Sequence, residues 1–166
     1  MRKILFIGIW LIFASAVAAQ QSPIYLENNR QIREGIELFN KEKFVPAQEF
    51  FQRYLVTNTD RHSELRKTAV FYHALCAVEL FHRDAEYLLT NFIYEYPESP
   101  LIRQAWFKLG SFFFRDKKYR DARKWFEKTE PEHLESEQVD EFHFKLGYCY
   151  FKAEDYDRAL AEFAMV

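Results

Sequence analysis

Glycine, proline and cysteine are scarce in this sequence, which has 4 Gly, 5 Pro and 2 Cys among its 166 residues. The few glycines leave no glycine-rich phosphate loop, and the sequence contains no nucleophile elbow, HExxH motif or paired CxxC motifs. We therefore expect neither a bound cofactor nor catalysis by this chain. Neither sign of charge prevails, because the formal net charge is only −2. This balance argues against nucleic acid as a partner.

Residues 1–19 differ in composition from the rest of the chain and have the pattern of an export signal. Two basic residues precede an apolar run from Ile4 to Phe13, and small residues follow it up to Ala19. A membrane anchor is the alternative, but a span needs roughly 20 apolar residues and this run is shorter. We expect a signal peptide cleaved after Ala18 or Ala19, which would change the net charge from −2 to −4. The mature protein is then expected in the periplasm or at the cell surface, with no stable membrane span.

The three glycines outside this leader recur in a fixed pattern. An alanine follows each glycine after twelve residues and a phenylalanine after sixteen, in the triplets Gly35/Ala47/Phe51, Gly110/Ala122/Phe126 and Gly147/Ala159/Phe163. A small residue on one helix lets a second, antiparallel helix approach closely, while the aromatic ring fills the space that remains. The pattern predicts an all-α protein made of repeated helical hairpins.

A fourth, degenerate hairpin is expected second in order. Here Cys76 takes the place of the glycine, and Ala85 follows it after only nine residues, so we expect a shortened turn around residues 81–84. The predicted units are residues 28–61, 69–99, 103–136 and 140–166, in one array over residues 20–166 that continues in a longer native chain. The expected helices are residues 27–41, 45–57, 64–81, 84–95, 100–115, 119–129, 137–152 and 156–165. Ser99 and Pro100 are expected to begin the fifth of these helices.

The third unit resembles the tetratricopeptide repeat, whose first helix has the pattern W-x2-L-G-x2-Y and whose second helix carries a small residue and an aromatic. The matching residues are Trp106, Leu109, Gly110, Phe113, Ala122 and Phe126. Unit four repeats them with Leu146, Gly147, Tyr150, Ala159 and Phe163. The resemblance implies a right-handed α-solenoid of about four units. Its repeat style is similar to that of bacterial periplasmic and outer-membrane-associated members of the family.

The resemblance also implies that the first helices line a concave groove that binds a protein or peptide. The lining expected in this chain is Ile32, Ile36, Phe39, Asn40, His73, Ala77, Phe81, Phe107, Ser111, Phe114, Arg115, Phe144, Tyr148, Phe151 and Lys152. Family members that bind a peptide's terminal carboxylate have lysine and asparagine where this chain has Ile32, Ile36, Phe107 and Ser111. Recognition of a terminal carboxylate is therefore not expected.

The two cysteines and the histidines raise two chemical alternatives, a metal site and a disulfide. His73, Cys76 and Glu79 share one helical face, but ligands from a single helix make an incomplete metal site. We expect Cys76 to be a packing residue and no metal to be bound. Cys76 and Cys149 lie two units apart, which is too far for a disulfide.

Two functions follow from this reading. The first is an exported, non-catalytic scaffold that binds a protein segment in the groove through aromatic contacts, although several of these aromatics could instead pack between units. The second is the N-terminal helical repeat region of a larger envelope enzyme or glycan-binding component, because the sequence stops inside a second helix without a polar capping helix.

Overall fold

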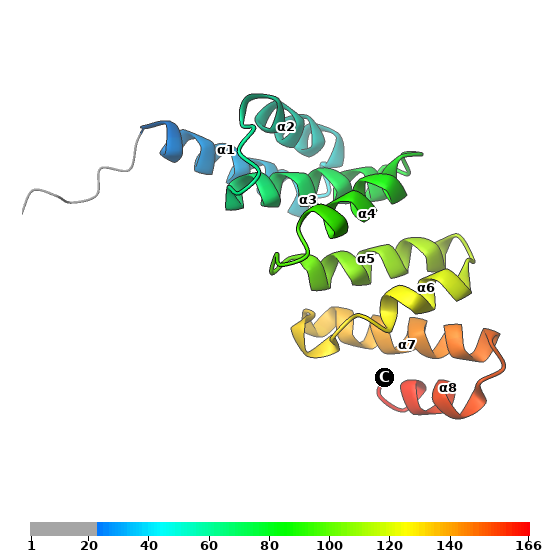
Figure 1. The fold of residues 1–166 in the computed structure, drawn as a ribbon. Coiled ribbons are helices and arrows are strands. Elements are labelled where there is room, and N and C mark those ends of the chain that lie inside the picture. Colours follow the sequence, from blue (N-terminus) through cyan, green and yellow to red (C-terminus); the bar gives the residue numbers. More distant parts are fainter. Residues whose placement is uncertain (1–22) are drawn as a thin grey trace, which may run out of the picture.

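The computed structural model describes residues 23–166, and within this range it contains helices and turns but no strand (Figure 1). This confirms the predicted all-α class. The elements are α1 (Pro23–Asn40), α2 (Phe44–Thr57), α3 (Glu64–Glu79), α4 (Ala85–Glu95), α5 (Ile102–Arg115), α6 (Tyr119–Phe126), the short 3-10 helix η1 (Pro131–His133), α7 (Ser136–Lys152) and α8 (Tyr156–Phe163). The predicted export signal lies outside the described residues.

Consecutive helices pair into four hairpins that stack in one direction, from α1 to α8 (Figure 1). The first helices pack on one another, α1 on α3, α3 on α5 and α5 on α7. The second helices also pack on first helices of the next hairpin, α2 on α3, α4 on α5 and α6 on α7. The array is an α-solenoid, as expected, and its first helices form a continuous layer.

Each hairpin of the triplet pattern closes by contact between its glycine and its phenylalanine. A methyl group added at Gly35 would lie 2.8 Å from Cε1 of Phe51, and one added at Gly110 would lie 2.7 Å from Cδ1 of Phe126. At Gly147 the corresponding distance to Cε1 of Phe163 is 2.7 Å. These separations are shorter than van der Waals contact, so a larger residue at any of the three positions would require the ring or the helix to shift.

Two residues beyond the end of every first helix lies a residue with a left-handed backbone. The residues are Glu42, Phe81, Lys117 and Glu154, with φ between 57° and 61°. In each turn the next residue donates a backbone hydrogen bond five residues back, as Lys118 does to the Phe113 carbonyl and His82 to the Ala77 carbonyl. This arrangement satisfies carbonyl groups at the helix end that would otherwise lack a partner.

The left-handed residue corrects the register of the second unit. In the first, third and fourth units, the left-handed residue follows Gly35, Gly110 and Gly147 by seven residues. In the second unit, the residue seven places before the left-handed Phe81 is Ala74. Ala74 therefore occupies the glycine position, and the assignment of Cys76 to it is wrong by two residues. The four equivalent positions then lie 39, 36 and 37 residues apart.

The turn of this second hairpin is also longer than expected. Residues 80–84 join α3 to α4, whereas three residues join the helices of each other hairpin. By these helix bounds the predicted shortening of the turn is wrong, although Ala85 follows Ala74 by eleven residues where the other units have twelve.

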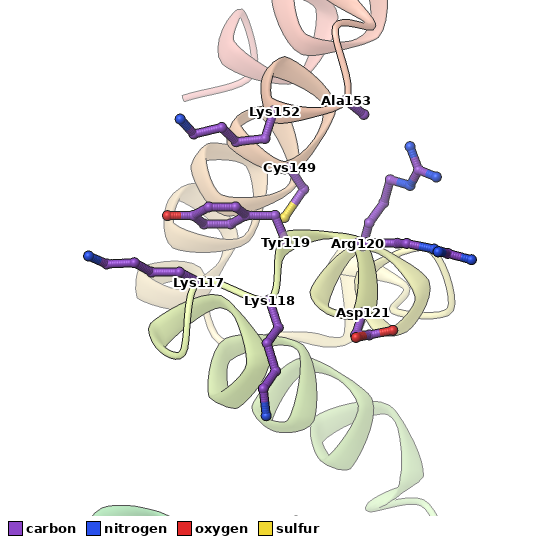
Figure 2. A pocket seen from close by; sticks show the side chains of 9 residues that line it. Lys117, Lys118, Tyr119, Arg120, Asp121, Cys149, Lys152 and Ala153 are labelled. Carbon is purple, nitrogen blue, oxygen red and sulfur yellow. The ribbon is translucent and has the colours of Figure 1, made fainter.

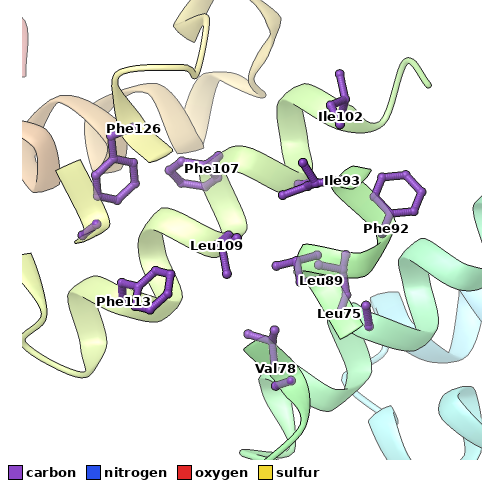
Figure 3. Close-up of a cluster of buried hydrophobic side chains, with 14 of the residues drawn as sticks. Leu75, Val78, Leu89, Phe92, Ile93, Ile102, Phe107, Leu109, Phe113 and Phe126 are labelled. Atoms are coloured by element: carbon purple, nitrogen blue, oxygen red, sulfur yellow. The ribbon is translucent and has the colours of Figure 1, made fainter. Parts of the chain in front are cut away.

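The buried side chains form a main core and a smaller one near the first unit. Phe92, Phe107 and Phe126 are among the largest fully buried residues of the main core (Figure 3). Cys76 belongs to the smaller core, with Phe51 and Tyr54 of α2. Both cysteines are buried and free, and burial raises the pKa of each thiol to about 12. As expected, the cysteines pack in the interior and form no disulfide.

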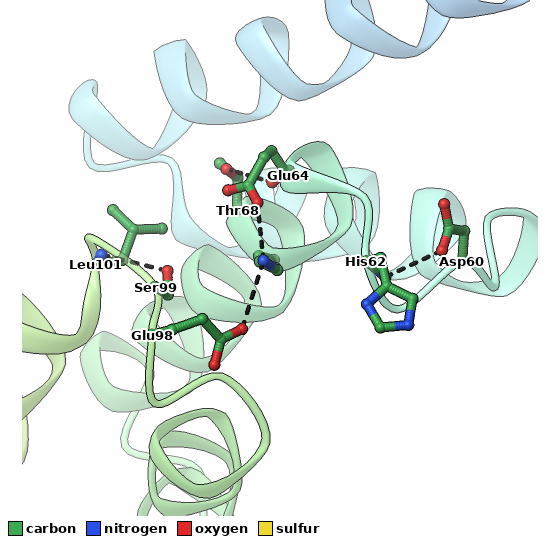
Figure 4. Close-up of polar contacts among 8 residues, drawn as sticks. Asp60, His62, Glu64, Thr68, Glu98, Ser99 and Leu101 are labelled. Carbon is green, nitrogen blue, oxygen red and sulfur yellow. Dashed lines mark hydrogen bonds and ion pairs between the residues drawn. The ribbon is translucent and has the colours of Figure 1, made fainter.

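The junction before α5 differs from the expectation in detail. Helix α5 begins at Ile102, two residues after the predicted Pro100. The Ser99 hydroxyl accepts a hydrogen bond of 3.3 Å from the Leu101 amide, just before the helix (Figure 4). Nearby, the Lys67 ammonium lies 2.8 Å from a carboxylate oxygen of Glu64 and 3.6 Å from one of Glu98, which links α3 to this junction (Figure 4).

Within residues 23–166, no helix has both the length and the apolar character needed to cross a membrane.

The glycine contacts predict different responses to the same substitution in two hairpins. Gly110→Ala should lower the free energy of unfolding by about 1–3 kcal/mol, because Phe126 is fully buried and has no space to move. Gly147→Ala should change it by less than about 1 kcal/mol, because Phe163 is 36% exposed and alanine favours the helix. Urea unfolding of both variants measures the difference. Equal losses would show that the ring contact does not constrain the hairpin.

Candidate functional site: a groove along the first helices

A cavity of about 390 Å³ opens between the first helices α3, α5 and α7. Its walls come from the end of α3, one face of α5 and the first half of α7. The lining residues are Val78, Glu79, Phe107, Lys108, Ser111, Phe112, Phe114, Arg115, Glu141 and Lys145. The groove thus has an aromatic floor and charged groups of both signs.

Lys145 fixes the α7 wall of this groove. Its ammonium donates a 3.0 Å hydrogen bond to the Ser111 hydroxyl and forms an ion pair with Glu141. It also lies 5.9 Å from the ring centroid of Phe107 and 5.7 Å from that of Phe114. The side chain is only 18% exposed, so its position between two rings and two oxygen ligands is well defined.

Arg115 forms the opposite rim. Both terminal nitrogens of its guanidinium donate hydrogen bonds of 3.3 Å to the Val78 carbonyl, near the end of α3. The guanidinium carbon lies 4.2 Å from the ring centroid of Phe81 and 5.5 Å from that of Phe112. Arg115 and Phe81, both predicted groove residues, therefore meet at the rim and join α3 to α5.

An aromatic cluster extends the groove along α7 beyond the cavity. The rings of Phe114, Tyr119 and Tyr148 contact one another with centroids 5.3–5.6 Å apart. Tyr148 also contacts Phe144 at 6.3 Å and Phe151 at 6.2 Å. Phe144 is 50% exposed and Phe151 is 47% exposed. The cluster combines a packed inner part with two rings that are about half exposed.

Three predicted lining residues are buried, and of these only Phe107 reaches the cavity wall. Ile32, Ala77 and Phe107 are exposed by 3% or less. Phe107 packs on Phe126, with ring centroids 6.2 Å apart, so only the edge of the cavity reaches it. Burial at this level leaves these three side chains little surface for contact with a partner.

Apart from Phe81 at the rim, the lining predicted from the first two units lies outside the cavity wall. Phe39 packs on Phe44 and Tyr72 with centroids 5.3 Å from each, which uses its ring between α1, α2 and α3. Ile36 and His73 are half-buried, and Asn40 is exposed. Burial lowers the pKa of His73. Lys152, at the end of α7, is exposed, and its ammonium lies 5.4 Å from the ring centroid of Tyr148.

The lining predicted from the repeat pattern lacks several residues that line the cavity. With Ala74 at the glycine position, Val78 and Glu79 of α3 become equivalent to Phe114 and Arg115 of α5, which explains their place in the wall. The pair Ala69 and Phe71, which matches Ala105 and Phe107, was the sequence signal for this register. Nothing in the repeat pattern pointed to Glu141 or Lys145.

Across residues 23–166, no three His, Cys, Asp or Glu side chains are grouped so that they could hold a metal ion. This includes His73, Cys76 and Glu79. Because the thiol pKa is raised to about 12, Cys76 is protonated at neutral pH and is a poor metal ligand.

Comparisons with known proteins agree with the repeat geometry. Sequence models described as tetratricopeptide repeat match residues 82–133 and residues 141–166. A crystal structure of MamA is similar, with a TM-score of 0.63 and 16% identity over 83% of this chain and 75% of that one. A second structure, MamA AMB-1 C2221, has a TM-score of 0.55 and 17% identity with the same coverage. No curated protein matches the sequence. At this identity the two structures are evidence for the fold alone.

The burial difference between two phenylalanines predicts which belongs to the core. Phe107→Ala should lower the free energy of unfolding by about 3–5 kcal/mol, because it leaves a cavity around a residue that is 1% exposed. Phe151→Ala should change it by less than about 0.5 kcal/mol, because the ring is 47% exposed. Thermal unfolding followed by circular dichroism compares the two. A large loss for Phe151→Ala would place that ring in the core and remove it from the groove.

Proposed function

Because this chain is a tetratricopeptide repeat protein, we propose that it is a non-catalytic scaffold that binds a segment of a partner protein along its first helices. Tetratricopeptide repeats typically serve protein interaction, and a fold by itself implies no chemistry. The observation that carries the proposal is the exposed aromatic surface of Phe144 and Phe151, which continues through Tyr148 into the cavity beside α5. Exposed aromatic side chains beside a recess are typical anchors for a partner segment.

The groove is suited to side chains of mixed character. Phe114 and Tyr148 offer apolar contact, while Ser111, Lys145 and Glu141 offer hydrogen bonds and charges that already hold one another in place. The groove can bind a partner segment without large rearrangement, because the ammonium of Lys145 is already positioned before the segment arrives.

The binding proposal is tested by two groove variants and one control. Ser111→Trp fills the cavity and Phe151→Ser removes an exposed anchor, so each should reduce partner recovery about tenfold or more. Tyr94→Ser is the matched control, because Tyr94 is 74% exposed but lies on the second helix α4. Recovery is measured by crosslinked pulldown from the native envelope, quantified against the wild-type chain.

Helicity measured by circular dichroism must stay at the wild-type level in all three variants. Unchanged recovery with both groove variants would contradict binding along α5 and α7, as would equal loss with Tyr94→Ser.

We also propose that this scaffold acts in the cell envelope, because residues 1–19 have the composition of a cleaved export signal. Expressed with these residues in a bacterium with a periplasm, the chain should accumulate there with its N-terminus at Ala19 or Gln20. Mass spectrometry of the fractionated protein measures both. A chain that keeps Met1 and remains in the cytoplasm or membrane would contradict export.

A further inference from the structure

A basic pocket of about 560 Å³ opens at the edge of the array, between the α5–α6 turn and the end of α7 (Figure 2). Five cationic side chains line it and only one carboxylate does. The lining residues are Lys117, Lys118, Tyr119, Arg120, Asp121, Arg123, Cys149, Lys152 and Ala153. This excess of positive charge contrasts with the formal net charge of −2 for the whole chain.

The positive charge of the pocket is only partly neutralised from within the protein. The single carboxylate, Asp121, lies 2.8 Å from the ammonium of Lys124, which is outside the pocket. The ammonium of Lys118 lies 3.6 Å from a carboxylate oxygen of Asp116. Of the ion pairs found within residues 23–166, none includes Lys117, Arg120 or Lys152. These three cations remain available to an anionic ligand.

The fold of the turn does not require basic residues. The α7–α8 turn has a left-handed residue at the equivalent position, since φ is 60° at Glu154 and 61° at Lys117. This turn nevertheless carries the acidic residues Glu154 and Asp155, and Asp157 follows at the start of α8. The α1–α2 turn has both signs, and its Lys41 is paired with Glu37 at 2.6 Å. Because equivalent turns accept either sign of charge, the backbone conformation does not account for the basic cluster.

The pocket continues the aromatic cluster of the groove. The ring of Tyr119 in the pocket lies 5.4 Å from that of Phe114 and 5.3 Å from that of Tyr148. The ammonium of Lys152 lies 5.9 Å from the ring centroid of Tyr119 and 5.4 Å from that of Tyr148. A segment that leaves the aromatic cluster towards the hairpin turns therefore enters the basic pocket.

We propose that this pocket binds acidic side chains of the same partner segment whose apolar side chains bind the aromatic cluster. The proposal rests on the proposed function and adds a partner class, an acidic peptide with apolar anchors beside its Asp or Glu residues. Carboxylates complement the unpaired cations Lys117, Arg120 and Lys152. The adjoining rings favour a peptide over an inorganic anion, because a free anion has no apolar part to place on them.

The test compares two synthetic peptides by fluorescence anisotropy. Both carry phenylalanines, followed by a run of glutamates in one and by serines in the other. The full-length mature chain should bind the glutamate peptide about tenfold more tightly at low salt, and added NaCl should reduce this preference because the charges are exposed. The combined variant Lys117→Glu, Arg120→Glu, Lys152→Glu should lose the preference.

The matched control reverses two lysines at another turn. Lys41→Glu with Lys43→Glu makes the same kind of change in the α1–α2 turn, away from the pocket, and should keep the preference. Circular dichroism of both variants must match that of the wild-type chain.

Equal binding of the two peptides, or binding of neither, would overturn the proposal. If both peptides bind equally and Phe151→Ser weakens both, the groove function stands and the acidic preference is wrong. Competition with inorganic phosphate alone tests whether the pocket instead binds a free anion. If phosphate displaces the glutamate peptide as effectively as unlabelled peptide does, the pocket is a phosphate site and the proposal is wrong.

Discussion

The contact between a glycine on a first helix and a phenylalanine on the following helix is the interaction on which the array depends. With no side chain at Gly110, the ring of Phe126 rests 2.7 Å from where a methyl group would be, and the two helices approach closely. The same contact at Gly35 and Gly147 joins the helices of two further hairpins, while Ala74 takes the glycine position in the second. The four hairpins stack with their first helices in one layer, and the cavity opens along this layer.

The groove has two parts that differ in how far the protein itself determines their geometry. Beside α5, the ammonium of Lys145 is held by Ser111 and Glu141 between two rings, so this part is formed in advance. Along α7, Phe144 and Phe151 are about half exposed and offer apolar surface to a ligand. A formed recess next to exposed rings suits a protein segment better than a small molecule, which would use only the recess. In our proposal, the basic pocket at Tyr119 extends this surface to acidic residues of the same segment.

The glycine triplets were sufficient to predict the helices, the hairpins and the family. They were not sufficient in the second unit, where no glycine marks the register. Cys76 was chosen there as the small residue, whereas the left-handed Phe81 shows that Ala74 occupies the position. A backbone conformation of this kind leaves no mark in the sequence when the residue is a phenylalanine. The burial of Phe107 was also beyond the repeat pattern, because it depends on packing against Phe126 of α6 and on the spacing that brings Lys145 of α7 over the ring. The pairing of Lys145 with Ser111 depends on the same spacing between two first helices.

In the proposed function, a partner segment lies along α5 and α7. Site-specific photo-crosslinking tests it most directly, with a photoreactive phenylalanine analogue placed at Phe144 on α7 or at Tyr94 on α4. The two rings are 50% and 74% exposed, so both positions accept the analogue without disturbing the core. We expect the analogue at position 144 to capture the partner and the analogue at position 94 not to capture it. Capture from position 94 alone, or equally from both positions, would contradict it.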